Sequence, residues 1–85
     1  MAEIRKTARN VVYNIAEGHR RRSTLEYIRF LDISEGSAAE LETQLLLAKE
    51  LGYWAPEIAA HHIDSLAEVD RMLTALMRAL REKLE

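Results

Sequence analysis

Cysteine is absent from this 85-residue chain, and it holds only one proline and three glycines. Without cysteine there is no disulfide and no thiolate chemistry, and a reducing cytoplasm is the compartment we expect. The scarcity of proline and glycine leaves few breaks in regular structure. No apolar run approaches the ~20 residues that cross a bilayer, and the N-terminus lacks the apolar core of a signal peptide. These absences favour a cytoplasmic helical protein with no membrane role.

Hydrophobic residues make up 48% of the chain and charged residues 31%. Such a mixture is typical of packed amphipathic helices and argues against disorder. The length fits one domain, so we expect residues 1–85 to form a single helical bundle.

Apolar residues recur every three or four positions in three segments, which predicts helices over 2–17, 24–51 and 56–84. The inward positions expected in the first are Ile4, Ala8, Val11, Val12, Ile15 and Ala16. Those in the second are Leu25, Ile28, Leu31, Ala38, Leu41, Leu45 and Ala48. Those in the third are Ala59, His62, Leu66, Val69, Leu73, Leu76 and Leu80. The fold class predicted is all-α: an antiparallel bundle with two long arms and one shorter helix.

Residues with special backbone roles mark the helix ends. Gly18 suits a left-handed cap that closes the first helix. Ser23 and Glu26 have the spacing of a capping box at the start of the second. Gly52 stops that helix, and Pro56 fits the first turn of the third.

Several short motifs occur in order along the chain: N-I-A-E-G at 14–18, R-F-L at 29–31, G-S-A-A-E-L-E-T-Q-L at 36–45 and L-G-Y at 51–53. With this series the chain resembles the four helix bundle protein family, also called the 23S rRNA intervening sequence protein family. The resemblance implies a helical bundle that assembles into ring-shaped homo-oligomers, commonly pentamers. Members usually begin with another amphipathic helix, for which this chain has no counterpart. We therefore expect an apolar groove that a further protomer or a helix of another protein fills.

We first interpret the motif residues as structural. We expect Glu26 to cap a helix, Glu40 or Glu42 to pair with an arginine across helices, and Asn14 and Gln44 to form interhelical hydrogen bonds. The full set of motif positions is Asn14, Glu17, Gly18, Ser23, Glu26, Arg29, Gly36, Glu40, Glu42 and Gln44.

Charge is distributed unevenly. Residues 1–29 carry seven cations against three anions, a net +4, whereas the remainder carries five cations and eleven anions, a net −6. A basic first third could present a patch to a polyanion, or it could match acidic groups within or between chains. The family pattern has a second glycine where this chain has Arg20, which makes the turn more cationic. The residues predicted to bind nucleic acid are Arg20, Arg21, Arg22, Arg5, Lys6 and Arg9.

No catalytic set is recognisable. The chain has no Gly-rich phosphate loop, zinc spacing or Ser-His-Asp pattern, and Glu57, His61, His62 and Asp64 make only a weak metal candidate. We expect a non-enzymatic protein without catalytic residues, cofactor or metal. The leading hypothesis is an oligomeric binding module for RNA or a ribonucleoprotein that recognises the backbone, because aromatics suited to stacking are few. The alternative is a protein–protein interaction scaffold or adapter without nucleic-acid binding.

Overall fold

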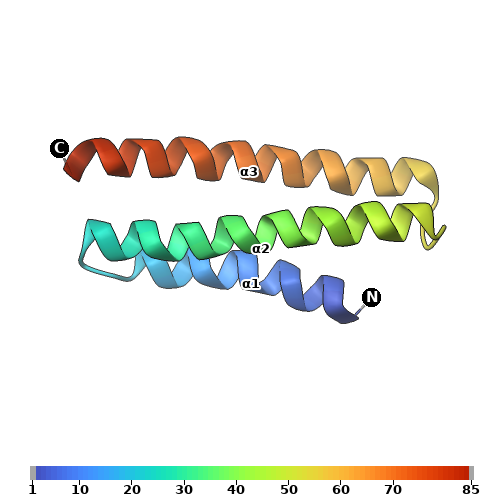
Figure 1. The fold of residues 1–85 in the computed structure, drawn as a ribbon, viewed down its shortest axis with the longest axis horizontal. Coiled ribbons are helices and arrows are strands. Elements are labelled where there is room, and N and C mark those ends of the chain that lie inside the picture. The colour runs from blue at the N-terminus through green and yellow to red at the C-terminus, as the bar shows by residue number, and fades with distance from the viewer. Residues whose placement is uncertain (1, 85) are drawn as a thin grey trace.

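The computed structural model describes residues 2–84, which form three helices and no strand. The helices are α1 (Ala2–His19), α2 (Thr24–Glu50) and α3 (Pro56–Leu84). Their lengths of 18, 27 and 29 residues confirm the prediction of two long arms and a shorter helix. Figure 1 shows that α1 and α3 run in the same direction and that α2 runs opposite to both.

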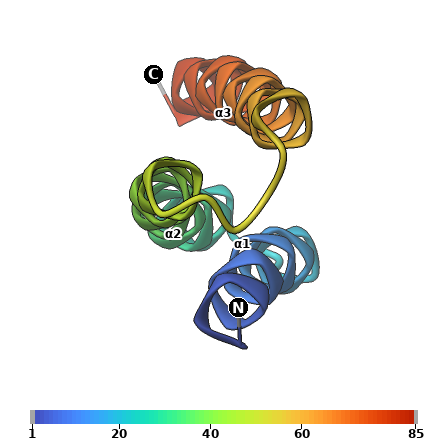
Figure 2. The ribbon, with the colours of Figure 1, turned by 90° about the vertical axis from the view of Figure 1, so that its right-hand side faces the viewer.

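The central element is α2. It packs against α1 on one side and α3 on another, whereas the backbones of α1 and α3 make no contact within the described residues. Viewed along the long axis, α1 and α3 flank α2 as the two arms of an angle (Figure 2). The three helices therefore occupy three corners of a square bundle.

The core lies mainly between α2 and α3. Its buried members are Ile28, Leu31, Leu73, Met77 and Leu80, with Ile15, Tyr27, Val69 and Leu76 packed against them. Four expected core positions are wrong, because Leu25 is 45% exposed, Val12 is 66% exposed, and Ala16 and His62 are exposed. Among residues 2–84, no further helix covers the outward side of α1, where Val12 and Tyr13 are exposed.

Three of the predicted helix ends are confirmed. Pro56 is the first residue of α3. The Ser23 hydroxyl accepts a hydrogen bond from the Glu26 backbone N–H at 3.3 Å, although no return bond from the Glu26 carboxylate forms within residues 2–84. Gly52 has a φ of +74° immediately after the cap residue Leu51, the left-handed conformation that ends a helix.

The predicted role of Gly18 is wrong. This residue lies inside α1, buried against α2, and its φ is not positive. A Cβ atom added there would lie 2.8 Å from the Cβ of Phe30 and 2.8 Å from the Cδ1 of Tyr27. Gly18 therefore serves the close approach of α1 and α2, and α1 continues to His19.

The predicted interhelical amide bonds are also wrong. Asn14 donates to the Asn10 carbonyl, and Gln44 donates to the Glu40 carboxylate, each within its own helix. The polar link between α1 and α2 is instead Ser34, which is fully buried and donates to the Val11 carbonyl at 2.7 Å.

Candidate nucleic-acid interface

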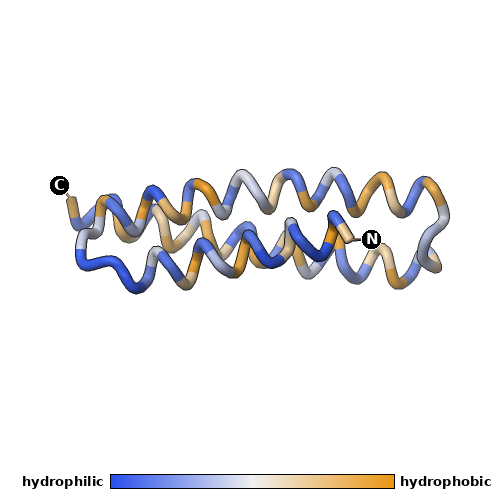
Figure 3. Tube along the Cα trace, turned by 90° about the horizontal axis from the view of Figure 1, so that it is seen from below, coloured by the Kyte–Doolittle hydropathy of each residue, from blue (hydrophilic) through white to orange (hydrophobic). Residues whose placement is uncertain are grey.

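Cationic residues from the α1–α2 connection, from α2 and from α3 gather at one end of the molecule. Figure 1 places the connection between α1 and α2 at the same end as the C-terminal turns of α3. That connection is strongly hydrophilic (Figure 3). The first turns of α2 begin there as well. The residues that these segments contribute, here called the cationic pole, are Arg20, Arg21, Arg22, Arg29, Arg78, Arg81 and Lys83.

Direct contacts fix the end of α3 beside the start of α2. The Arg81 guanidinium lies 3.4 Å from the Asp32 carboxylate, and Leu80 packs in the same cluster as Ile28. The sequence analysis missed Arg78, Arg81 and Lys83, because only the antiparallel pairing of α2 and α3 brings them to residues 20–29.

The pole differs in net charge from the rest of the chain. The same segments hold four carboxylates (Glu17, Glu26, Asp32 and Glu82) against seven cations, a net +3. The rest of residues 2–84 holds five cations and nine acidic residues, a net −4. An anion approaching this molecule is therefore attracted to one end and repelled by the body.

Local ion pairs at the pole are weak. Glu17 contacts Arg20 at 3.7 Å and Arg21 at 3.4 Å, but the two arginine side chains are 77% and 43% exposed. Arg22, Arg29, Arg78 and Lys83 have no ion-pair partner among residues 2–84. Since exposed ion pairs contribute only about 0–1 kcal/mol, Arg20 and Arg21 can exchange Glu17 for phosphate at little cost.

The aromatic rings near the pole are already packed against other side chains of the same chain. The Arg21 guanidinium lies 4.7 Å from the centre of the Phe30 ring, and Tyr27 meets His19 edge-on at 5.9 Å. Phe30 and Tyr27 are half-buried. This end therefore offers phosphate-binding donors but no open platform on which bases could stack.

Arg5, Lys6 and Arg9 do not join the pole. They lie in the N-terminal half of α1, toward the opposite end of the bundle. Lys6 lines a polar hollow with Glu3 and Glu40, whereas Arg9 lies on the outer face of α1 beside Val12. The six residues predicted as one site thus occupy separate surfaces.

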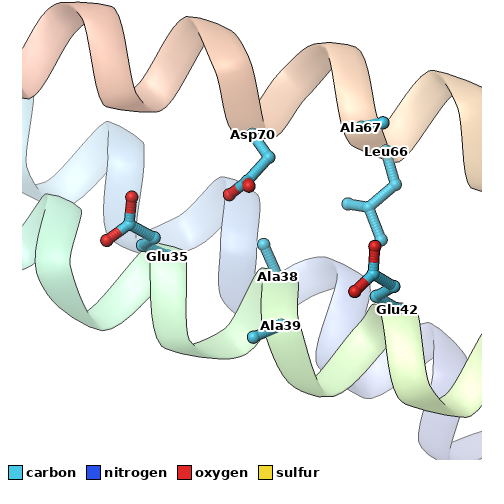
Figure 4. Close-up of a pocket in the computed structure, with 7 residues that line it drawn as sticks. All are labelled: Glu35, Ala38, Ala39, Glu42, Leu66, Ala67 and Asp70. Carbon is cyan, nitrogen blue, oxygen red and sulfur yellow. The ribbon is translucent and has the colours of Figure 1, made fainter.

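The expected pairing of Glu40 or Glu42 with an arginine is wrong. Glu40 accepts a hydrogen bond from Gln44 at 3.4 Å, and no arginine pairs with either carboxylate within the described part of the chain. Glu42 instead lines a small cleft of about 130 Å³ between α2 and α3, together with Glu35 and Asp70 (Figure 4). This flank of the bundle is anionic and repels phosphate.

An apolar groove lies on the opposite flank, between α1 and α3. Its first part has a volume of about 310 Å³ and a floor formed by Leu41 and Leu45 of α2. A second part of about 280 Å³ is lined by Ile15 of α1 and by Val69, Met72, Leu73 and Leu76 of α3. The groove that the sequence predicted is therefore present. Trp54 and His62 lie at one end of it, with ring centres 5.2 Å apart.

Neither a metal site nor a membrane span is found. Among residues 2–84, no group of three or more His, Asp or Glu side chains is arranged to hold a metal ion. No helix in that range is both long and apolar enough to cross a membrane.

Three helices around an open apolar groove, with cations collected at one end, define an all-α helical-bundle protein. The chain belongs to the 23S rRNA-intervening sequence protein family, whose model matches residues 1–75. A search of curated proteins finds no match. The α3 residues of the cationic pole (Arg78, Arg81 and Lys83) lie beyond the matched segment.

Proposed function

We propose that the protein is a non-enzymatic, RNA-associated binding module whose cationic pole grips the phosphate backbone. The observation that carries this proposal is the convergence of seven cations from separate parts of the sequence at one end of an otherwise anionic molecule. Guanidinium groups bind phosphate through paired donors, and six of the seven residues are arginines. The family name refers to ribosomal RNA, which favours RNA over other polyanions.

Recognition is of backbone shape more than of base sequence. Because the rings nearest the pole are covered or paired, stacking on bases contributes little. Structured RNA with closely spaced phosphates is therefore the ligand class that the pole fits best.

The test is a salt titration of binding to a labelled structured RNA. For wild type, the logarithm of the binding constant should fall steeply with the logarithm of salt concentration. The variant in which Arg20, Arg21 and Arg22 are all replaced by Ala should bind at least about tenfold more weakly. Its salt slope should be smaller by about two to three, because three phosphate contacts are lost.

A matched control removes three cations elsewhere: Lys6→Ala, Lys49→Ala and Arg71→Ala in one chain. It changes net charge equally but leaves the pole intact, so it should bind nearly as wild type. Equal losses in the two triple variants would show that only overall charge matters and would overturn the proposal. Circular dichroism of both variants checks that the helices are retained.

The alternative function, a protein-interaction scaffold, is favoured by the apolar groove between α1 and α3. Binding there proceeds by burial of apolar surface and responds little to salt. Absence of RNA binding at low salt, in a protein that still binds partners through the groove, would support this function.

A further inference from the structure

We propose that Ser23 is the acceptor site of an arginine-directed serine kinase, and that its phosphorylation releases RNA by adding negative charge to the cationic pole. The modification itself is independent of RNA binding. Its effect on binding rests on the proposed function of the pole.

The backbone around Ser23 suits a kinase substrate. Among the serines and threonines of residues 2–84, Ser23 alone lies outside a helix. It is exposed, and its backbone is extended, with φ of −90° and ψ of 129°. Within the described chain, the N–H groups of Arg22 and Ser23 donate no backbone hydrogen bond. A kinase can therefore align this hydroxyl with the phosphorus that it transfers without opening a helix.

Three arginines directly precede the hydroxyl. Arg20, Arg21 and Arg22 occupy the three positions before Ser23. The side chains of Arg20 and Arg21 are 77% and 43% exposed, and their ion pairs with Glu17 are weak. Kinases select substrates by such charge patterns, because carboxylates in the substrate groove bind guanidinium groups through paired hydrogen bonds. The connection between α1 and α2 thus fits a kinase whose substrate groove is acidic.

The other hydroxyls that follow cations are less accessible. Thr24 is half-buried in the first turn of α2. Thr7 is 5% exposed, and its hydroxyl donates to the Glu3 carbonyl at 2.9 Å. Thr74 lies within α3, where its hydroxyl is bonded to a carboxylate of α2. The structure therefore favours Ser23 as the acceptor.

Phosphoryl transfer to Ser23 is compatible with the fold. The Ser23 hydroxyl oxygen attacks the terminal phosphorus of ATP, the bond from that phosphorus to its bridging oxygen breaks, and ADP leaves. The hydroxyl proton passes to the catalytic carboxylate of the kinase. Helix α2 keeps its cap, because a phosphate oxygen can accept the Glu26 N–H that the hydroxyl accepts in the unmodified chain. Negative charge is also favourable at the start of a helix.

The phosphate cancels most of the positive charge of the pole. Seven cations and four carboxylates give a net +3, and a phosphoserine adds about −2, which leaves about +1. The neighbouring guanidinium groups bind this phosphate within the chain and are no longer open to RNA. The number of RNA phosphates that the pole neutralises therefore falls by about two, and the salt slope of binding falls with it.

The acceptor site is tested first, without RNA. The purified chain is incubated with ATP and an arginine-directed serine kinase, and the intact mass and fragment spectra are recorded. We expect one phosphoryl group per chain, at Ser23. Ser23→Asn should take up none, and it is a matched variant because Asn caps a helix as well as Ser does. No incorporation, incorporation at another hydroxyl, or an unchanged rate in a chain carrying both Arg20→Ala and Arg21→Ala would overturn the site.

The effect on RNA is tested next, at one salt concentration. The phosphorylated chain should bind a structured RNA at least about tenfold more weakly than the unmodified chain. Ser23→Asp should bind about threefold more weakly than Ser23→Asn, which matches it in size and capping, so that the difference reports charge. Equal binding by the phosphorylated and unmodified chains would overturn the release and leave RNA binding intact. Absence of binding by the unmodified chain would overturn the proposed function and the release with it, whereas the acceptor site would stand on the mass spectra.

Discussion

At the scale of single residues, two glycines in helical segments have opposite roles. Gly18 lies where a Cβ would meet Phe30 and Tyr27 at 2.8 Å, whereas a Cβ at Gly36 would have open space around it. Sequence position alone does not separate these cases. What separates them is whether the glycine faces another helix or solvent.

Gly18→Ala should therefore destabilise the fold and Gly36→Ala should stabilise it. Overpacking at Gly18 is expected to cost about 1–3 kcal/mol, more than the gain in helix propensity. At Gly36 the gain in helix propensity of about 1 kcal/mol is not opposed by any steric contact. Urea unfolding of the two variants measures both free energies. A stabilised Gly18→Ala would show that α1 and α2 do not approach closely there.

Polar residues were the hardest to assign from sequence. Asn14 and Gln44 fit the pattern of buried interhelical amides, yet both bond within their own helix. The small side chain of Ser34 makes the buried cross-helix bond instead. A serine within a helix gives no sequence signal of this kind, because its partner is a backbone carbonyl 23 residues away.

At the scale of elements, α2 organises the fold because both other helices pack on it. Hydrophobic periodicity was sufficient to predict all three helices, with ends within two residues of those found. The start of α2 was also predictable, since Ser23 caps it through a local bond. The end of α1 was not, because Gly18 is held by packing against α2.

Loss of the Ser23 cap should weaken the whole bundle. Ser23→Ala leaves the Glu26 N–H without its side-chain acceptor, and we expect about 1 kcal/mol less stability in thermal or urea unfolding. Thr43→Ala is the control, because Thr43 is exposed and bonds only to its own helix. If both variants lose the same stability, the cap is not what secures this end of α2.

At the scale of the whole molecule, the cationic pole depends on topology. Arg20, Arg21 and Arg22 were visible as a basic run, but Arg78, Arg81 and Lys83 join them only because α3 returns along α2. The other predicted residues are Arg5, Lys6 and Arg9. They are near the basic run in the sequence, but they lie on other surfaces of α1. Three of the six residues predicted to bind nucleic acid thus lie in the pole, and the three members of the pole from α3 could not be placed there from the sequence.

The central claim, that the cationic pole contacts RNA phosphates, is tested most directly by NMR. In an amide ¹H–¹⁵N titration of the ¹⁵N-labelled chain with a structured RNA, we predict that the largest shifts fall at residues 19–30 and 78–84. Shifts centred instead on the groove residues or on the opposite end near Gly52, or no shifts at low salt, would contradict this account.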